Sequence, residues 1–177
     1  SAPAKLLSFS WCSGRLDTWD GVAWSSTALP SQSWCGGEGG HAVFDEGSGP
    51  GVYFGGTMSD TGSTHVIRYF GTTFTVMPDG LLAADGSMSI SSMTVNTLGT
   101  TPTLFIGGGT LGPDNVRARG MLTYSNGELS SVSPVGGPTA QFTIEPTYGN
   151  EVYPLAAFDS DGDGPEAPVM VAGGNFY

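Results

Sequence analysis

The sequence predicts an all-β protein built from short antiparallel strands, and its composition is the first reason. The 177 residues include 29 Gly and 12 Pro, which interrupt helices and favour tight turns. Hydrophobic residues make up 38% of the chain and aromatic residues 11%. That is enough apolar side chain for the core of one domain, so disorder is not expected.

The charge of the chain excludes several classes of partner. Five Lys and Arg residues against 16 Asp and Glu give a formal net charge of −11. Nucleic-acid binding requires cationic side chains that replace phosphate counterions, so we expect no nucleic-acid partner. No apolar run approaches the roughly 20 residues of a membrane-spanning helix, and we expect no membrane insertion. Cations, neutral glycans and basic proteins remain compatible with this charge.

An internal repeat supports the same fold class. One signature is an apolar strand that follows a proline and ends in a pair of glycines; it occurs at 50–56, 102–108 and 168–174. A second signature is an apolar-aromatic strand that enters a Gly turn; it occurs at 16–21, 67–71 and 122–127. Repeats of roughly 50 residues indicate an architecture of stacked, similar units.

Each repeat predicts four short strands. In the first complete unit they lie at about 41–45, 51–54, 65–70 and 72–77. In the second unit they lie at about 89–95, 103–106, 120–124 and 128–133. Four-stranded antiparallel units with Gly and aromatic punctuation predict β-propeller-like blades.

The repeat also predicts how one domain over 1–177 is organised. The expected parts are a half-blade at 1–40, a blade at 41–80, a blade at 86–134, an insertion at 135–150 and a half-blade at 151–177. The chain is expected to start with the last two strands of a blade and to end with the first two. A propeller needs at least about four blades to surround its axis. Either three units close in an unusual way, or the complementary half-blades pair with other copies.

Two segments carry a resemblance to a known family. The segment 43–56 reads VFDEGSGPGVYFGG, and the hairpin 19–24 reads WDGVAW. Together they resemble the blades of secreted bacterial repeat propellers. The resemblance implies a propeller fold and an extracellular or cell-surface location. It implies no particular activity, because propellers serve in binding, catalysis and scaffolding alike.

The two cysteines, Cys12 and Cys35, are expected to form a disulfide. An acidic chain rich in small polar residues suits an oxidising compartment. Closing this loop stabilises a fold by roughly 3 kcal/mol in the chain-entropy description. The alternative is a pair of buried free thiols.

An acidic turn near the end of the chain predicts a Ca²⁺ site. Asp159, Asp161 and Asp163 alternate with small residues, and Glu166 follows closely. Alternate carboxylates on a tight turn converge hard oxygen ligands, which suit Ca²⁺. The motif resembles the start of an EF-hand loop, although Met170 stands where that loop has its last Glu. The alternative is a solvated acidic turn.

No motif predicts catalysis. The sequence has no Gly-x-Ser-x-Gly elbow and no zinc-type spacing of His or Cys. Carboxylate pairs exist, but no feature places two of them around a pocket for glycoside chemistry. We therefore expect a protein that is not an enzyme, with a glycoside-active enzyme as the least favoured alternative.

The favoured function is an extracellular structural or adhesive module that self-assembles head to tail through its terminal strands. Exposed strand edges are templates for strand addition, and pairing that does not close yields a filament. The residues expected at these ends are Leu6, Leu7, Phe9 and Trp11 on one side and Val169 and Val171 on the other. The alternative is a lectin-like propeller that binds glycans, with its tryptophans stacked on sugars.

Overall fold

The computed structural model of the chain is an all-β protein. It describes residues 6–10, 14–29, 34–35, 40–58, 63–77, 90–98, 101–108, 121–131, 151–162, 164 and 168–175. Within these ranges every regular element is a strand, and every strand pairing is antiparallel. The all-β prediction is confirmed. Over the same ranges no helix has the length and apolar character needed to cross a membrane.

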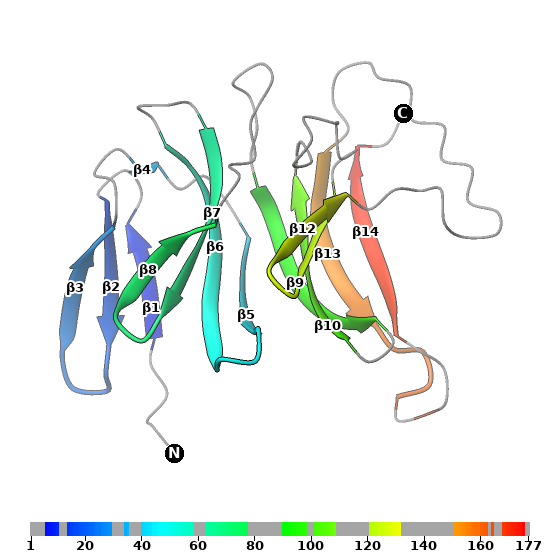
Figure 1. The fold of residues 1–177 in the computed structure, drawn as a ribbon, viewed down its shortest axis with the longest axis horizontal. Coiled ribbons are helices and arrows are strands. Elements are labelled where there is room, and N and C mark those ends of the chain that lie inside the picture. Colours follow the sequence, from blue (N-terminus) through cyan, green and yellow to red (C-terminus); the bar gives the residue numbers. More distant parts are fainter. Residues whose placement is uncertain are drawn as a thin grey trace.

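The strands form four sheets that follow one another in chain order (Figure 1). The first sheet contains β1 (Leu6–Ser10), β2 (Arg15–Trp19) and β3 (Trp24–Ala28). The second contains β4 (Trp34–Cys35), β5 (His41–Asp45), β6 (Pro50–Met58), β7 (Ser63–Phe70) and β8 (Thr73–Val76). The third contains β9 (Ile90–Leu98), β10 (Thr101–Gly108), β11 (Met121–Ser125) and β12 (Glu128–Ser131). The fourth contains β13 (Glu151–Phe158) and β14 (Val169–Asn175).

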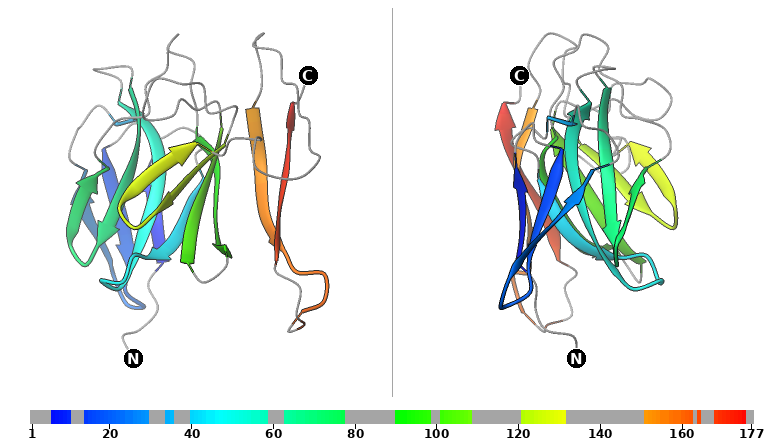
Figure 2. Two further views of the ribbon diagram at one scale, coloured as in Figure 1. Left: turned by 45° about the vertical axis from the view of Figure 1, so that its right-hand side comes forward. Right: turned by 90° about the vertical axis from the view of Figure 1, so that its left-hand side faces the viewer.

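The sheets are stacked as an open row. The first and fourth sheets are separate and lie at opposite ends of it (Figures 1 and 2). The third sheet has the expected four strands in the order β12-β11-β10-β9. The predicted insertion at 135–150 lies outside the described residues.

The first sheet corrects one sequence-based expectation. Head-to-tail assembly through the terminal strands predicts that the apolar strands at 6–11 and 16–19 have no partners within their own chain and pair with another copy. Instead β1 pairs with β2 along its whole length, from Leu6 opposite Trp19 to Ser10 opposite Arg15. The sheet therefore has three strands rather than two, and both edges of β2 are occupied, by β1 and β3. Apolar periodicity identifies strands, but it does not say which strands pair.

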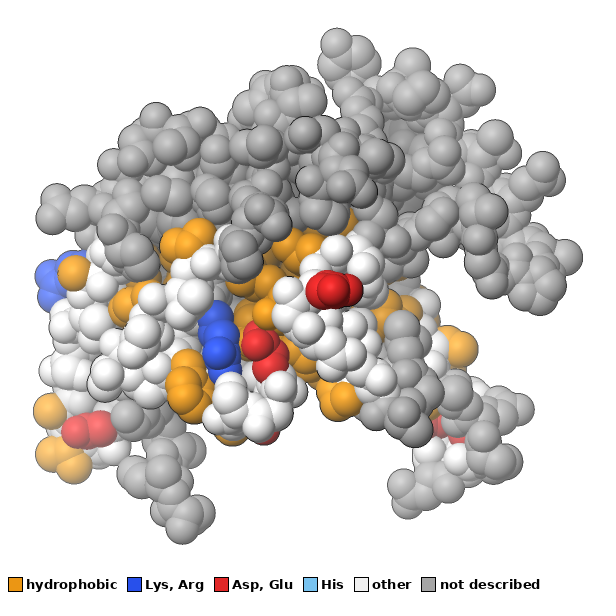
Figure 3. All heavy atoms as spheres, viewed as in Figure 1, with side chains coloured by type: hydrophobic (Ala, Val, Ile, Leu, Met, Phe, Trp, Pro, Cys, Tyr) orange, Lys and Arg blue, Asp and Glu red, His pale blue; other side chains and the backbone are white. Residues whose placement is uncertain are grey.

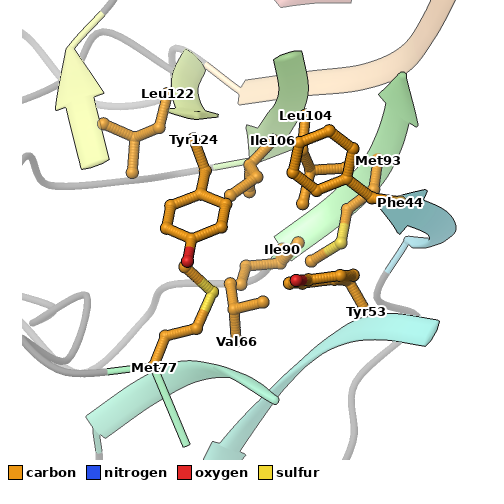
Figure 4. Packing of buried hydrophobic residues seen from close by; sticks show 10 residues of the cluster. All are labelled: Phe44, Tyr53, Val66, Met77, Ile90, Met93, Leu104, Ile106, Leu122 and Tyr124. Atoms are coloured by element: carbon orange, nitrogen blue, oxygen red, sulfur yellow. The ribbon is translucent and has the colours of Figure 1, made fainter. Parts of the chain in front are cut away.

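Two clusters of buried side chains hold the first three sheets together. The larger lies between the second and third sheets (Figure 4) and comprises Phe44, Tyr53, Val66, Met77, Ile90, Met93, Leu104, Ile106, Leu122 and Tyr124. The smaller lies between the first and second sheets and comprises Leu16, Leu29, Phe54 and Ile67. Full burial of one such side chain stabilises a fold by roughly 1.5–3 kcal/mol, so these clusters are the main attraction between sheets.

Glycines of the repeated Gly pair sit where neighbouring sheets approach most closely. A Cβ atom at Gly55 would lie 2.5 Å from the Cβ of Ile90 on the third sheet. A Cβ atom at Gly107 would lie 2.9 Å from Cγ1 of Val152 on the fourth sheet. Both distances are too short for a real Cβ, so only glycine fits without displacing the next sheet. Gly55 and Gly107 therefore mark the positions where the following sheet packs.

We expect Gly55→Ala to lower the free energy of unfolding by roughly 1–3 kcal/mol, as overpacking in cores does. In a double-mutant cycle with Ile90→Ala, the combined loss should be smaller than the sum, because the truncated side chain makes room for the new methyl group. Urea denaturation of the four proteins measures both quantities. Strictly additive losses would show that Gly55 does not act through its contact with Ile90.

Candidate functional site

The second and fourth sheets share one arrangement of side chains. In β5 and β6, Phe44 pairs with Gly51 and Ala42 pairs with Tyr53. In β13 and β14, the corresponding cross-strand pairs are Phe158 with Val169 and Ala156 with Val171. Because side chains alternate along a strand and opposite residues share a face, each set of four points to one side of its sheet. The shared register makes the two surfaces directly comparable.

In the second sheet this surface is covered by the third sheet. Phe44 and Tyr53 are 2% and 0% exposed. The ring of Tyr124, from β11 of the third sheet, lies 6.3 Å from the ring of Phe44 and 6.1 Å from that of Tyr53, measured between centroids. These are distances at which aromatic rings attract one another. The packing of Tyr124 on Phe44 and Tyr53 therefore shows how a sheet in this row covers the sheet before it.

The third sheet repeats this arrangement. Phe105 lies two residues before Gly107, as Tyr53 lies two residues before Gly55, and it is 3% exposed. Gly107, on the same face of β10, faces Val152 and Leu155 of β13. A register shift between Val152 and Leu155 interrupts the alternation of β13, so both side chains reach the third sheet. The fourth sheet therefore covers the third as the third covers the second.

In the fourth sheet the equivalent surface is open. Phe158 and Val171 are 55% and 50% exposed, and Val169 is exposed to a similar extent. We call this surface the end face and define it as Ala156, Phe158, Val169 and Val171. Contiguous exposed apolar side chains commonly mark interaction sites. The side chains that the third sheet covers on the second sheet therefore have exposed counterparts on the fourth.

The outer side of the first sheet carries an aromatic pair, of which Trp24 is exposed and Trp19 is half-buried. Trp19 and Trp24 lie opposite one another in β2 and β3, with ring centroids 5.6 Å apart. We call them the tryptophan pair. The hairpin between them is held by the carboxylate of Asp20, which accepts hydrogen bonds from the backbone N–H groups of Val22 at 2.8 Å and Ala23 at 2.9 Å. This capped turn fixes the two rings at the end of the sheet.

Comparison of the chain with protein-family models, curated proteins and solved structures found no match.

A polar cluster flanks the covered surface of the second sheet. The hydroxyl of Tyr53 donates a hydrogen bond to the carboxylate of Glu46. Nη2 of Arg68 donates to Oγ of Ser48 at 2.7 Å, and the guanidinium lies 4.8 Å from the centroid of the Phe70 ring. Figure 3 shows a basic and an acidic group side by side among hydrophobic and neutral side chains.

The electrostatics of this cluster favour a structural role. Burial, together with the Glu46 carboxylate, raises the pKa of Tyr53 above its usual value and that of Tyr124 to about 12. Both phenols therefore keep their protons at physiological pH. Because Tyr53 and Glu46 come from the second sheet and Tyr124 from the third, the cluster helps to hold Tyr124 over the surface that it covers.

The acidic turn holds only part of the predicted Ca²⁺ site within the described residues. Asp159 and Asp161 are exposed, and the backbone N–H of Asp161 donates to Oδ1 of Asp159 at 3.2 Å. Asp163 and Glu166 lie outside the described residues. Over the described ranges no three potential metal-ligating side chains converge. The Ca²⁺ site stays a prediction.

The remaining predicted residues fall in different surroundings. Cys35 lies on β4, but its side chain and the whole of Cys12 lie outside what the structure describes, so the disulfide stays a prediction. Leu7 packs against the smaller core cluster of its own chain. The side chains of Leu6 and Phe9, and all of Trp11, are outside the described set. Val169 and Val171 lie on the end face.

Phe158 and the tryptophan pair were not among the residues predicted for assembly. The signal that identifies Phe158 was present, because Phe158-Asp159 precedes the third copy of the strand signature as Phe44-Asp45 precedes the first. The sequence does not show that Phe44 is buried. Only the contrast between the buried Phe44 and the exposed Phe158 identifies Phe158 as part of an interface.

We expect the phenol of Tyr124 to titrate near pH 12 in the folded protein, against 10.0 for a free tyrosine. Because the folded state holds this proton more tightly than the unfolded state, the associated stability is complete below pH 10 and is lost as the pH rises through the folded pKa. Glu46→Gln removes a nearby negative charge and should lower the pKa of Tyr124. NMR of ring-labelled tyrosine measures the pKa of Tyr124 in the unmodified chain and in Glu46→Gln, and Tyr124→Phe identifies its signal. Equal pKa values in the two proteins would show that the Glu46 carboxylate does not raise the pKa of Tyr124.

Proposed function

We propose that this chain is an extracellular structural module of propeller-type sheets that assembles head to tail with further copies of itself. The observation that carries the proposal is the end face. Equivalent surfaces are buried wherever another sheet follows in the row, and this one is open where the row stops. A surface that the repeat elsewhere covers with a sheet is best completed by another sheet of the same kind.

The arrangement of the row favours a second copy as the source of that sheet. The first and fourth sheets lie at opposite ends (Figure 2), so the first sheet of the same copy does not cover the end face. Contacts between different surfaces of identical chains are heterologous, and they propagate unless the rotation between copies closes a ring. The proposal therefore includes an open filament or a closed ring, without catalysis.

The energetics predict reversible association. Covering the exposed halves of three apolar side chains contributes on the order of 1 kcal/mol for each, whereas bringing two molecules together costs at least several kcal/mol. Contacts beyond the end face must supply the rest, and the assembled fraction should depend strongly on concentration. A high local concentration, as in a surface layer outside the cell, would favour the assembled state.

A second candidate function is glycan binding by the first sheet. On the outer side of this sheet Asp17 and Ser26 form the cross-strand pair next to the tryptophan pair, and Arg15 lies further along the same face. An aromatic surface flanked by hydrogen-bonding groups suits a sugar, which offers both C–H and hydroxyl groups. A glycan array probed with the chain and with Trp24→Ala tests this candidate; specific binding that the substitution removes would support it.

We expect Val171→Asp to abolish self-association, because it places a charge on the apolar end face. Sedimentation equilibrium over a range of concentrations should give a rising average mass for the unmodified chain and the monomer mass for the variant. Val43→Asp is the matched control: Val43 is also an exposed valine, on β5, but it points to the opposite side from Phe44.

The control variant should associate like the unmodified chain. If the unmodified chain keeps the monomer mass at every concentration, the proposed function is refuted. If Val171→Asp and Val43→Asp lose self-association to the same extent, the added charge causes the loss wherever it stands, and the end face is not the interface.

A further inference from the structure

We infer that the tryptophan pair of one copy docks on the end face of the next copy, as Tyr124 docks on Phe44 and Tyr53 within the chain. The inference rests on the proposed function and specifies the two surfaces that meet. Its basis is a correspondence between the hairpins of the first three sheets, which place aromatic or apolar pairs at the same position.

The correspondence is set by the strand register. Each pair lies one position before the residues that close its hairpin turn. Tyr69 pairs with Phe74 before Phe70 with Thr73, and Tyr124 pairs with Leu129 before Ser125 with Glu128. Trp19 pairs with Trp24 before the backbone hydrogen bond from Asp20 N–H to the Ala23 carbonyl. The rings of Tyr69 and Phe74 lie 4.8 Å apart between centroids, close to the spacing of the tryptophan pair. Each pair sits on the second and third strands of the repeat unit, so the three pairs occupy one structural position.

In the second and third sheets this position faces the preceding sheet. Tyr69 and Phe74 pack against the cluster that includes Leu16 of the first sheet. Tyr124 and Leu129 pack against the cluster that includes Tyr53 of the second sheet. Each pair therefore covers the surface of the sheet that comes before it in the row.

Among the residues that the structure describes, no sheet lies against the tryptophan pair of the first sheet. Leu16 and Thr18 are buried on the side of β2 that faces the second sheet. Trp19 alternates with Thr18 and so points to the other side, where Trp24 is 54% exposed. The row thus ends in two open surfaces that correspond to the two sides of one internal interface.

At one position of the contact the sizes of the side chains compensate. At the internal contact Tyr124 meets Tyr53. At the junction between copies, Trp19 stands for Tyr124 and the smaller Val171 stands for Tyr53. A larger ring against a smaller side chain preserves the fit that packing between sheets requires.

One difference sets the strength of the junction. Asp17 and Ser26 occupy the positions that Ile67 and Val76 hold in the second sheet, and the Ser26 hydroxyl donates a hydrogen bond to the Asp17 carboxylate. Apolar contact at the junction is therefore confined to the tryptophan pair. We expect it to be weaker than the internal interfaces.

Docking through the faces of sheets also accommodates the pairing of the first sheet. Completion of β14 by β2 of another copy would require a free edge on β2, and both of its edges are taken by β1 and β3. Stacking one sheet on another requires no free edge. The first sheet therefore meets another copy through its outer face, which carries the tryptophan pair, and not through an edge of β2.

A mixing experiment with two variants tests the inference. Trp24→Asp should disable one surface and Val171→Asp the other, so each variant alone should sediment as a monomer. An equimolar mixture retains one intact junction, between the tryptophan pair of Val171→Asp and the end face of Trp24→Asp. The mixture should form a species of twice the monomer mass and grow no further. A mixture of Val171→Asp with Phe158→Asp, both altered on the end face, should stay monomeric.

The outcomes separate this inference from the proposed function. Association of the unmodified chain that Val171→Asp abolishes and Trp24→Asp leaves intact would overturn the inference and retain the proposed function. Absence of association in the unmodified chain would overturn both. Trp24→Asp that still assembles but loses binding to a glycan would assign the pair to a sugar ligand and overturn the inference. Circular dichroism checks that each variant is folded, and Trp24→Ser replaces any Trp24→Asp protein that is not.

Discussion

The packing of one sheet on the face of the next is the interaction on which the rest of the structure depends. Its best-defined example is the contact of Tyr124 with Phe44 and Tyr53, which are almost completely buried. A sheet of two to five short strands has too little core of its own, so each sheet is stable only when a neighbour covers its apolar face. The same dependence leaves an unsatisfied surface wherever the row of sheets ends.

Glycines and capped turns make this packing possible. Gly55 and Gly107 let the following sheet approach to distances that a side chain would prevent. The Asp45 carboxylate accepts hydrogen bonds from the backbone N–H groups of Gly47 and Gly49, as Asp20 does in the first hairpin. Glycines therefore let neighbouring sheets pack closely, and aspartates cap the turns that end the strands.

Local features of the fold could be predicted from the sequence, and the relations between sheets could not. Strand and turn positions follow from Gly and Asp punctuation, as at Asp45 and Gly47, because turn geometry depends on neighbouring residues. The pairing of β1 with β2 was missed, because the choice of strand partner depends on tertiary contacts. The end face was found only in part: Val169 and Val171 were predicted, but Phe158 becomes significant only when Phe44 is seen to be buried.

The central claim is that another sheet covers Phe158, and hydroxyl-radical footprinting of the unmodified chain tests it most directly. Phe158 is 55% exposed on the end face, whereas Phe70 is 39% exposed on the second sheet and serves as an internal reference. We predict that oxidation of Phe158 falls as the protein concentration rises while oxidation of Phe70 stays constant. Equal oxidation of Phe158 at every concentration would contradict the account.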